Sequence, residues 1–156
     1  MNPLRRLLLK GAGASGAVLA AIAAGALRPG QVLAASWNTG AFEAKKVGDA
    51  MSGLGIANPV DSADIVMKAP DIAENGAVVP IEVTSNVPNT QKLSIFIDNN
   101  PNPLCASFEL AGGAMPSVSV RVKMQQTSNV RAVAHAGGKF YVAAKEVKVT
   151  IGGCGG

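Results

Sequence analysis

A strict alternation of polar and apolar residues over 117–124 is the feature that most limits how this chain can fold. The eight residues, SVSVRVKM, change character at every step. This is the period of a half-buried β-strand, and no helix has it. Similar alternation, or short apolar runs, predict further strands at 79–84, 92–98, 130–134 and 145–151, and less clearly at 65–68, 104–110 and 139–143.

Turn-forming residues separate these runs. Asn75-Gly76 and Gly137-Gly138 tolerate positive φ angles, and the segment 98–103 is polar and contains prolines. Roughly seven or eight short strands, with turns every 8–12 residues or so, predict an all-β, antiparallel β-sandwich. A closed barrel is the alternative architecture.

One segment has the composition of a helix. Residues 41–51 read AFEAKKVGDAM, with Thr39 as a candidate N-cap and Gly53 as a candidate stop. We therefore expect one short helix on the N-terminal side of the strands.

The first 35 residues have the pattern of an export signal. A charged start with Arg5-Arg6 precedes an uncharged stretch at 11–27, and small residues follow at Ala34-Ala35. The apolar stretch is short for a transmembrane span, so a retained membrane anchor is the weaker interpretation. The arginine pair resembles a twin-arginine (Tat) signal, an address for the export of folded proteins. We expect a Tat signal at 1–35, a β-sandwich domain at 36–151, a periplasmic location, and a folded partner subunit that shares the route.

The charge of the chain belongs mostly to this leader. The whole chain has 14 Lys and Arg against 10 Asp and Glu, and residues 1–35 hold four of the basic residues and no acid. Residues 36–156 therefore have 10 of each sign and a net charge near zero. This balance gives no support to nucleic-acid binding or to a polybasic membrane-binding patch.

The remaining residues give little support to catalysis or metal binding. His135 is the only histidine, whereas a zinc site needs about four ligands, or three and a water. No nucleophile or Gly-rich loop stands in a recognisable catalytic motif. The dispersed Met51, Met67, Met115 and Met124 leave a copper-handling or other non-covalent binding module as an alternative, although Met67 and Met124 fall inside strand patterns. We predict a protein that is not an enzyme and uses no metal or cofactor.

The C-terminal pentapeptide is the main candidate site. It reads Gly152-Gly153-Cys154-Gly155-Gly156. Because glycine has no side chain to restrict φ and ψ, the four glycines predict a flexible arm whose only side chain is the thiol. Three residues beyond the last predicted strand, the sulfur has a reach of roughly 10 Å. Nothing in the tail supplies a cation that would lower the pKa of the thiol. The arm is therefore predicted to hold a covalently attached group on which other proteins act.

The second cysteine, Cys105, leaves a structural alternative open. Exported proteins often join two cysteines, and a Cys105–Cys154 disulfide would make the chain a non-catalytic structural or binding module. Cys105 lies in an apolar run, where a thiol usually behaves as a small hydrophobe. A homodimer linked through Cys154 is a further possibility and is compatible with a carrier at rest.

Several segments of the chain together point to one protein family. They are the ending VKVTIGGCGG at 147–156, APDIAENG at 69–76, VPI at 79–81, NPL at 102–104 with Phe108, and GGKFY at 137–141. With these segments and its twin-arginine leader, the chain resembles the SoxY family, the sulfur-carrier subunit of the bacterial thiosulfate-oxidising system. The ending at 147–156 carries most of the resemblance.

The resemblance implies a fold, a site and a set of partners. The fold would be an immunoglobulin-like β-sandwich that forms a heterodimer with SoxZ. Cys154 would be the point of covalent attachment. The chain would dock transiently to the haem enzyme SoxAX, which couples thiosulfate to the thiol, and to the hydrolase SoxB, which releases sulfate and leaves a persulfide. Where present, the sulfane dehydrogenase SoxCD would oxidise the outer sulfur.

Overall fold

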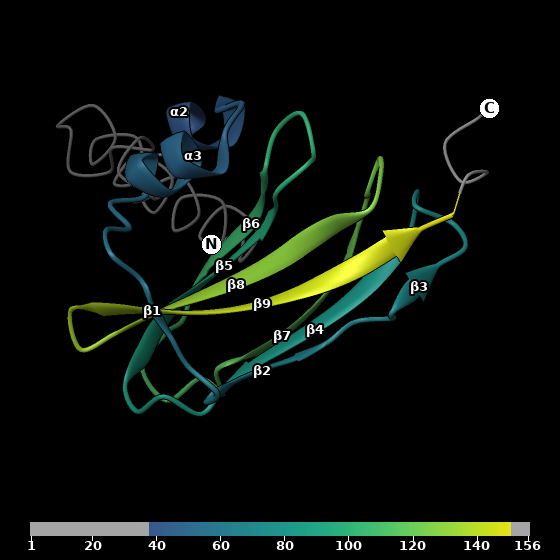
Figure 1. Ribbon diagram of the computed structural model, residues 1–156. Coiled ribbons are helices and arrows are strands. Elements are labelled where there is room, and N and C mark those ends of the chain that lie inside the picture. Colours follow the sequence, from purple (N-terminus) through teal and green to yellow (C-terminus); the bar gives the residue numbers. More distant parts are fainter. Residues whose placement is uncertain (1–37, 151–156) are drawn as a thin grey trace, which may run out of the picture. The chain divides into compact units, whose positions relative to one another are not determined.

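The computed structural model describes residues 38–150, which form a β-sandwich with two short helices (Figure 1). The predicted leader at 1–35 and the predicted arm at 152–156 lie outside the described residues. The elements, in chain order, are α2 (Thr39–Glu43), α3 (Val47–Gly53), β1 (Val60–Asp61), β2 (Ile65–Lys68), β3 (Ile72–Ala73), β4 (Val79–Ser85), β5 (Thr90–Ile97), β6 (Leu104–Glu109), β7 (Ser117–Val122), β8 (Ser128–Ala136) and β9 (Lys139–Val149).

Two sheets make up the sandwich. The larger sheet has the order β1-β9-β8-β5-β6, with β3 also paired to β9, and the smaller has the order β2-β4-β7. The long strands pair antiparallel, whereas the two-residue strands β1 and β3 run parallel to β9. The prediction of an all-β sandwich is confirmed, and the closed barrel is wrong because the strands form two separate sheets.

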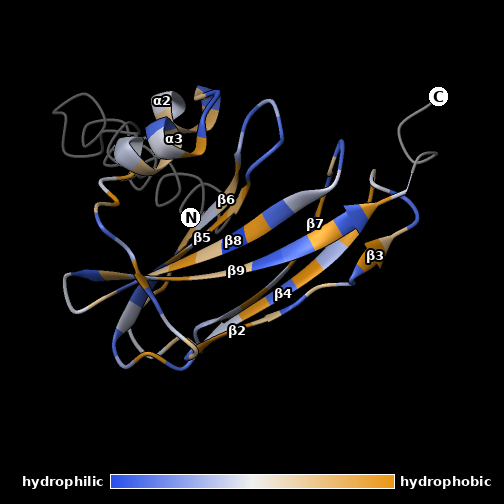
Figure 2. Cartoon of the chain, viewed as in Figure 1, coloured by the Kyte–Doolittle hydropathy of each residue, from blue (hydrophilic) through white to orange (hydrophobic). Residues whose placement is uncertain are grey.

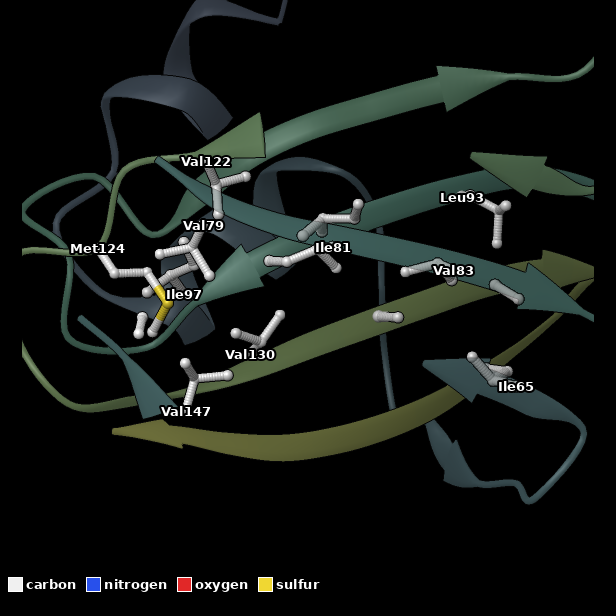
Figure 3. Packing of buried hydrophobic residues seen from close by; sticks show 14 of the residues in the cluster. Ile65, Val79, Ile81, Val83, Leu93, Ile97, Val122, Met124, Val130 and Val147 are labelled. Carbon is white, nitrogen blue, oxygen red and sulfur yellow. The ribbon is translucent and has the colours of Figure 1, made fainter. Parts of the chain in front are cut away.

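The alternation of apolar residues places one face of each sheet in a shared core. In β4 the burial pattern alternates at every residue, with Val79, Ile81 and Val83 almost fully buried. Figure 2 shows the same alternation of colour along β4. These side chains meet Leu93, Ile95 and Ile97 of β5 and residues from β8 and β9, as Figure 3 shows for ten labelled residues. Full burial of a Val, Leu or Ile contributes about 1.5–3 kcal/mol each, so this core supplies most of the stability.

The outer face of the larger sheet is covered at one end by the helices. Phe96, Val133 and Val142 point away from the main core and pack with Ala41 of α2 and Ala50 of α3. Central strands of the larger sheet are therefore apolar on both faces. This second cluster explains why β5 is buried at five consecutive positions, from Leu93 to Ile97.

The single helix predicted at 41–51 is two helices in the structure. Ala44 has φ −55° and ψ 142°, and Lys46 is extended, so the helix breaks between them. The N-cap is Asn38, whose side chain accepts a hydrogen bond from the Ala41 amide, and not Thr39. Gly53 ends α3 as predicted. A Cβ at Gly53 would lie 2.9 Å from the Cβ of Ala41, so the glycine lets the two helices pack closely.

The strands lie close to their predicted positions, with one correction. The segments predicted at 139–143 and 145–151 are one strand, β9, which pairs with β8 continuously from Lys139 to Val147. The exposed Ala144 does not interrupt this ladder. The strands β1 and β3 are too short to give a pattern and were not predicted.

Of the two glycine-containing turns that the sequence predicts, one has the expected positive φ angles, and in the other the glycine is required for a different reason. Gly137 and Gly138 have φ of 56° and 75° and connect β8 to β9. Asn75 and Gly76 are not among the positive-φ residues. Gly76 is instead required by space, because a Cβ there would collide with the carbonyl oxygen of Met124 and approach Val149.

Within residues 38–150, no helix has the length and apolar character needed to cross a bilayer.

Candidate functional site

The predicted carrier thiol of Cys154 and its four flanking glycines lie outside the described residues. The structure does describe the strand from which this segment continues, up to Thr150. The geometry of that strand end determines where the thiol segment starts.

Inward-facing valines hold the end of β9 on the core. Val147 is fully buried and Val149 packs against the main cluster, whereas Lys148 between them is exposed. Figure 3 shows Val147 beside Val130 in this part of the core. The alternation of buried and exposed side chains therefore continues to Val149, the last residue of β9. This alternation determines which face of the strand end lies on the core.

The strand β3 holds the same strand end along one edge. The Lys148 amide donates to the Asp71 carbonyl at 3.0 Å, and the Thr150 amide donates to the Ala73 carbonyl at 3.1 Å. The Thr150 hydroxyl donates to the Glu74 carbonyl at 3.4 Å. Figure 1 shows β3 beside the end of β9.

A side-chain hydrogen bond holds the opposite edge of this strand end, and Gly76 packs closely against the Val149 side chain. The Val149 amide donates to the Thr127 hydroxyl at 3.0 Å, just before β8 begins. The Met124 amide donates to the Gly76 carbonyl at 2.7 Å, which places Gly76 against the Val149 side chain. We call Val149, Thr150 and their partners Ala73, Glu74, Gly76 and Thr127 the tail root.

The tail root limits how far the thiol can travel from the sandwich. Four peptide units separate Thr150 from Cys154. At 3.3–3.6 Å per residue, their full extension is about 14 Å. The chain length therefore limits the distance between the Thr150 and Cys154 Cα atoms to about 14 Å.

Cys105 lies on β6, in a different environment from that predicted for Cys154. It is a free, half-buried thiol at the bulge between β5 and β6 and packs against the main core. Its Sγ donates a hydrogen bond to the Pro103 carbonyl at 3.5 Å. Burial raises the pKa of the Cys105 thiol to about 11, although hydrogen bonds with Asn100 and Ile97 act in the opposite direction. A thiol with so little thiolate at neutral pH is a poor nucleophile.

The other residues singled out in the sequence have structural environments. His135 stacks on Phe140 across the β8–β9 hairpin, with ring centroids 4.8 Å apart. Met124 is fully buried, Met67 packs against the main core and Met51 packs in the second cluster, whereas Met115 is exposed. The four methionines thus lie in different places. In residues 38–150, no three His, Cys, Asp or Glu side chains lie together in a way that would hold a metal ion.

The sequence reasoning missed the contributions of Ala73, Glu74 and Thr127 to the tail root, and it singled out Gly76 only as a turn residue. Thr127 gave no signal, because a lone threonine before a strand is common. Ala73 and Glu74 lie in a segment that carried the family resemblance, but β3 is only two residues long. Their role depends on contacts with residues more than 20 positions away in the chain.

Comparison with known proteins decides the family. The model of the family "Sulfur oxidation protein SoxY" matches residues 52–154, from α3 to Cys154. The chain belongs to the SoxY family. The SoxY resemblance stated from the sequence is therefore confirmed, and the family is one of sulfur carriers.

A solved SoxY structure agrees with this assignment. The sulfur carrier protein SoxY from Chlorobium limicola f thiosulfatophilum is 44% identical and superposes with a TM-score of 0.62, over 68% of this chain and 97% of its own. This likeness confirms the immunoglobulin-like sandwich. The superoxide reductase (neelaredoxin) from Ignicoccus hospitalis is far more distant, at 18% identity and a TM-score of 0.49 over 66% of this chain and 89% of its own. No curated protein is significantly similar to this chain.

Proposed function

We propose that this chain carries thiosulfate-derived sulfur covalently on the thiol of Cys154 and presents it to partner enzymes in the periplasm. The observation that carries the proposal is that the SoxY family match continues past β9 and includes Cys154. The tail root supports it, since it holds the start of the tail on a rigid sandwich while the glycines at 152, 153, 155 and 156 leave the thiol segment unencumbered by side chains.

The chemistry of loading needs an electron acceptor. The Cys154 thiol and thiosulfate would join through a new S–S bond, giving a cysteine S-thiosulfonate, one proton and two electrons. A haem enzyme of the SoxAX type would accept the two electrons. Hydrolysis by a SoxB-type enzyme would then break the terminal S–S bond with one water, releasing sulfate and a proton and leaving a persulfide.

The outer sulfur of the persulfide has two fates. A SoxCD-type dehydrogenase would add three oxygens from three waters and remove six electrons and seven protons, giving a cysteine S-sulfonate. A second hydrolysis would release sulfate and restore the thiol. In this scheme the chain contributes the attachment point and the positioning, and its partner enzymes contribute the catalysis. SoxZ is the proposed partner subunit of the heterodimer, and the twin-arginine leader is the proposed export signal.

Cys105 is the only other thiol and is a poor competitor for this role. It is half-buried, bonded to Pro103 and little ionised. The alternative function, a structural module with a Cys105–Cys154 disulfide, is therefore less well supported than the carrier function.

The mass of the C-terminal tryptic peptide tests the proposal. Cleavage after Lys148 yields the peptide 149–156. We expect this peptide, from protein isolated without reductant during thiosulfate oxidation, to have a mass raised by sulfur or thiosulfonate that reductant removes. A peptide found only in linkage to the Cys105 peptide would show a structural disulfide and refute the carrier function.

A further inference from the structure

Two exposed apolar side chains lie next to the tail root. Ile72 of β3 is 57% exposed and Val78, in the loop between β3 and β4, is 53% exposed. Ile72 pairs with Lys148 in the parallel ladder, and the next residue, Ala73, is buried. Since successive strand residues point to opposite faces, Ile72 faces the solvent. The hydrophobic colour of β3 beside the end of β9 is visible in Figure 2.

Val78 is held in place by the turn that precedes it. The Val78 amide donates to the Asn75 carbonyl at 3.4 Å, and the Ala77 amide donates to the Asn75 side chain at 2.9 Å. Two residues earlier, Gly76 is buried against Met124 and Val149. Val78 is therefore presented on a fixed turn, and its exposure does not come from a loosely attached loop.

The reach of the thiol makes this position significant. By the spacing of paired strands, the Ile72 Cα lies roughly 8 Å from the Thr150 Cα, whereas the tail from Thr150 to Cys154 extends about 14 Å. When an active site encloses the thiol, part of the segment between Thr150 and Cys154 lies inside that active site. The surface of the receiving protein around its entrance must then lie against the residues that surround Thr150.

We propose that Ile72 and Val78 form a docking surface for the enzymes that receive the tail, and that this surface packs against an apolar rim at the entrance to their active sites. The inference rests on the proposed carrier function, because the tail length is what specifies the occupant. Two exposed charged residues, Lys148, which is the ladder partner of Ile72, and Glu74, which follows β3, supply the polar surroundings usual for a protein interface.

The chain contains a matched control for this surface. Val60 of β1 is 58% exposed, almost the same as Ile72, and pairs with Tyr141 near the other end of β9. Nine residues along the strand separate Tyr141 from Thr150, which is roughly 30 Å. Val66 of β2 is 41% exposed and pairs with Thr84, which lies next to the last residue of β4 and far along that strand from Val78. Both positions are beyond the reach of the tail.

Binding measured without chemistry tests the surface directly. The full exported chain with its bound subunit, carrying Cys154→Ser, would be titrated with the purified hydrolase that acts on the loaded thiol and with the purified haem enzyme. We expect Ile72→Thr with Val78→Thr to raise Kd roughly fiftyfold, because the two substitutions remove three apolar carbons from the contact, and Val60→Thr with Val66→Thr to leave it unchanged. Threonine keeps the β-branched shape of each strand residue.

Equal Kd values for the two double variants, or no binding by the parent chain, would overturn the docking surface. A second measurement separates this result from the carrier function. With Cys154 intact and loaded, Ile72→Thr with Val78→Thr should raise KM for sulfate release and leave kcat unchanged. A chain that cannot be loaded refutes the carrier function, while the titration still decides the docking surface. If Ile72→Thr weakens folding, Val78→Thr alone, outside any strand, serves with Val60→Thr as its control.

Discussion

The Val149 amide donates a hydrogen bond of 3.0 Å to the hydroxyl of Thr127, a residue 22 positions earlier in the chain. The pairing of β8 with β9 ends at Val147, so this side-chain hydrogen bond holds β9 beyond its last ladder partner in β8. Together with the bond from Thr150 to Ala73, it determines where the sandwich ends and the thiol segment begins.

Replacing Thr127 with valine should loosen the tail root without changing its shape. The Val149 amide loses its acceptor, and a hydrogen bond of this kind contributes about 1 kcal/mol. We expect its hydrogen-exchange protection to fall roughly fivefold, while the Thr150 amide, bonded to Ala73, changes less. Thr84→Val, which removes a hydroxyl bonded to Ser117 on the smaller sheet, is the control and should leave Val149 protected. Unchanged exchange in Thr127→Val would show that the bond has no role in holding the strand end.

Gly76→Ala should destabilise the whole domain. The new Cβ would overlap the Met124 carbonyl oxygen and approach Val149, and overpacking of this kind costs about 1–3 kcal/mol. Urea unfolding would measure the loss. Gly112→Ala is the matched control, because it has open space around it and no positive φ. Equal unfolding midpoints for the two variants would contradict the steric explanation.

The two thiols should differ sharply in their response to pH. With a pKa of about 11, only about one Cys105 thiol in a thousand is ionised at pH 8. Iodoacetamide at pH 8 should therefore label Cys154 first, and labelling of Cys105 in the folded chain should accelerate as the pH approaches 11. Equally fast labelling of both thiols at pH 8 would contradict the buried environment of Cys105.

The same shift predicts a loss of stability at high pH. The folded pKa of about 11 lies above the ordinary thiol pKa of 9.0, so the unfolded chain releases the Cys105 proton first. The stability from the protonated thiol is present below pH 9 and is lost between pH 9 and 11. Denaturant unfolding of the native chain should show a steeper decline across this range than Cys105→Ala, which has no thiol to ionise. Parallel curves would contradict the shift.

Cys154→Ser should abolish support of thiosulfate oxidation and leave the fold intact. The thiol is the proposed attachment point, and in the sequence it follows Val149, the last of the described residues that packs on the core. We expect the thermal unfolding midpoint to change by less than about 1 °C, in line with small effects at sites away from the core. Cys105→Ser is the comparison and should retain activity. Loss of activity in Cys105→Ser at full stability would argue for a role of that thiol in the cycle.

Conservative replacement of the arginine pair tests the export route. Arg5→Lys with Arg6→Lys preserves the charge of the leader but removes the pair that a twin-arginine receptor reads. The protein should then accumulate inside the cell, as measured by fractionation. Normal export of this variant would favour a general secretory signal over the twin-arginine route.

The sequence by itself determined the strand positions and the fold class. The alternation over Ser117–Val122 and Val79–Ser85 is local, because a strand with one buried face repeats every two residues. Gly137-Gly138 specified its turn for the same reason, since positive φ is a property of a residue and its neighbours. The thiol flanked by glycines also needed no structure to be recognised.

Tertiary structure decided what depends on contacts between distant residues. The local pattern did not show the break between α2 and α3. The segments predicted at 139–143 and 145–151 belong to one strand because both pair with β8, and the pairing of β3 with β9 joins segments that lie far apart in the chain. The requirement for Gly76 comes from Met124 and Val149, not from its own φ. The position of Cys105 at a bulge between β5 and β6 appears only in the paired strands. A local pattern shows which face of a helix or strand is apolar. Which helices and strands pack together is decided only when the whole chain folds. The hydrogen bonds that hold the start of the tail result from that packing.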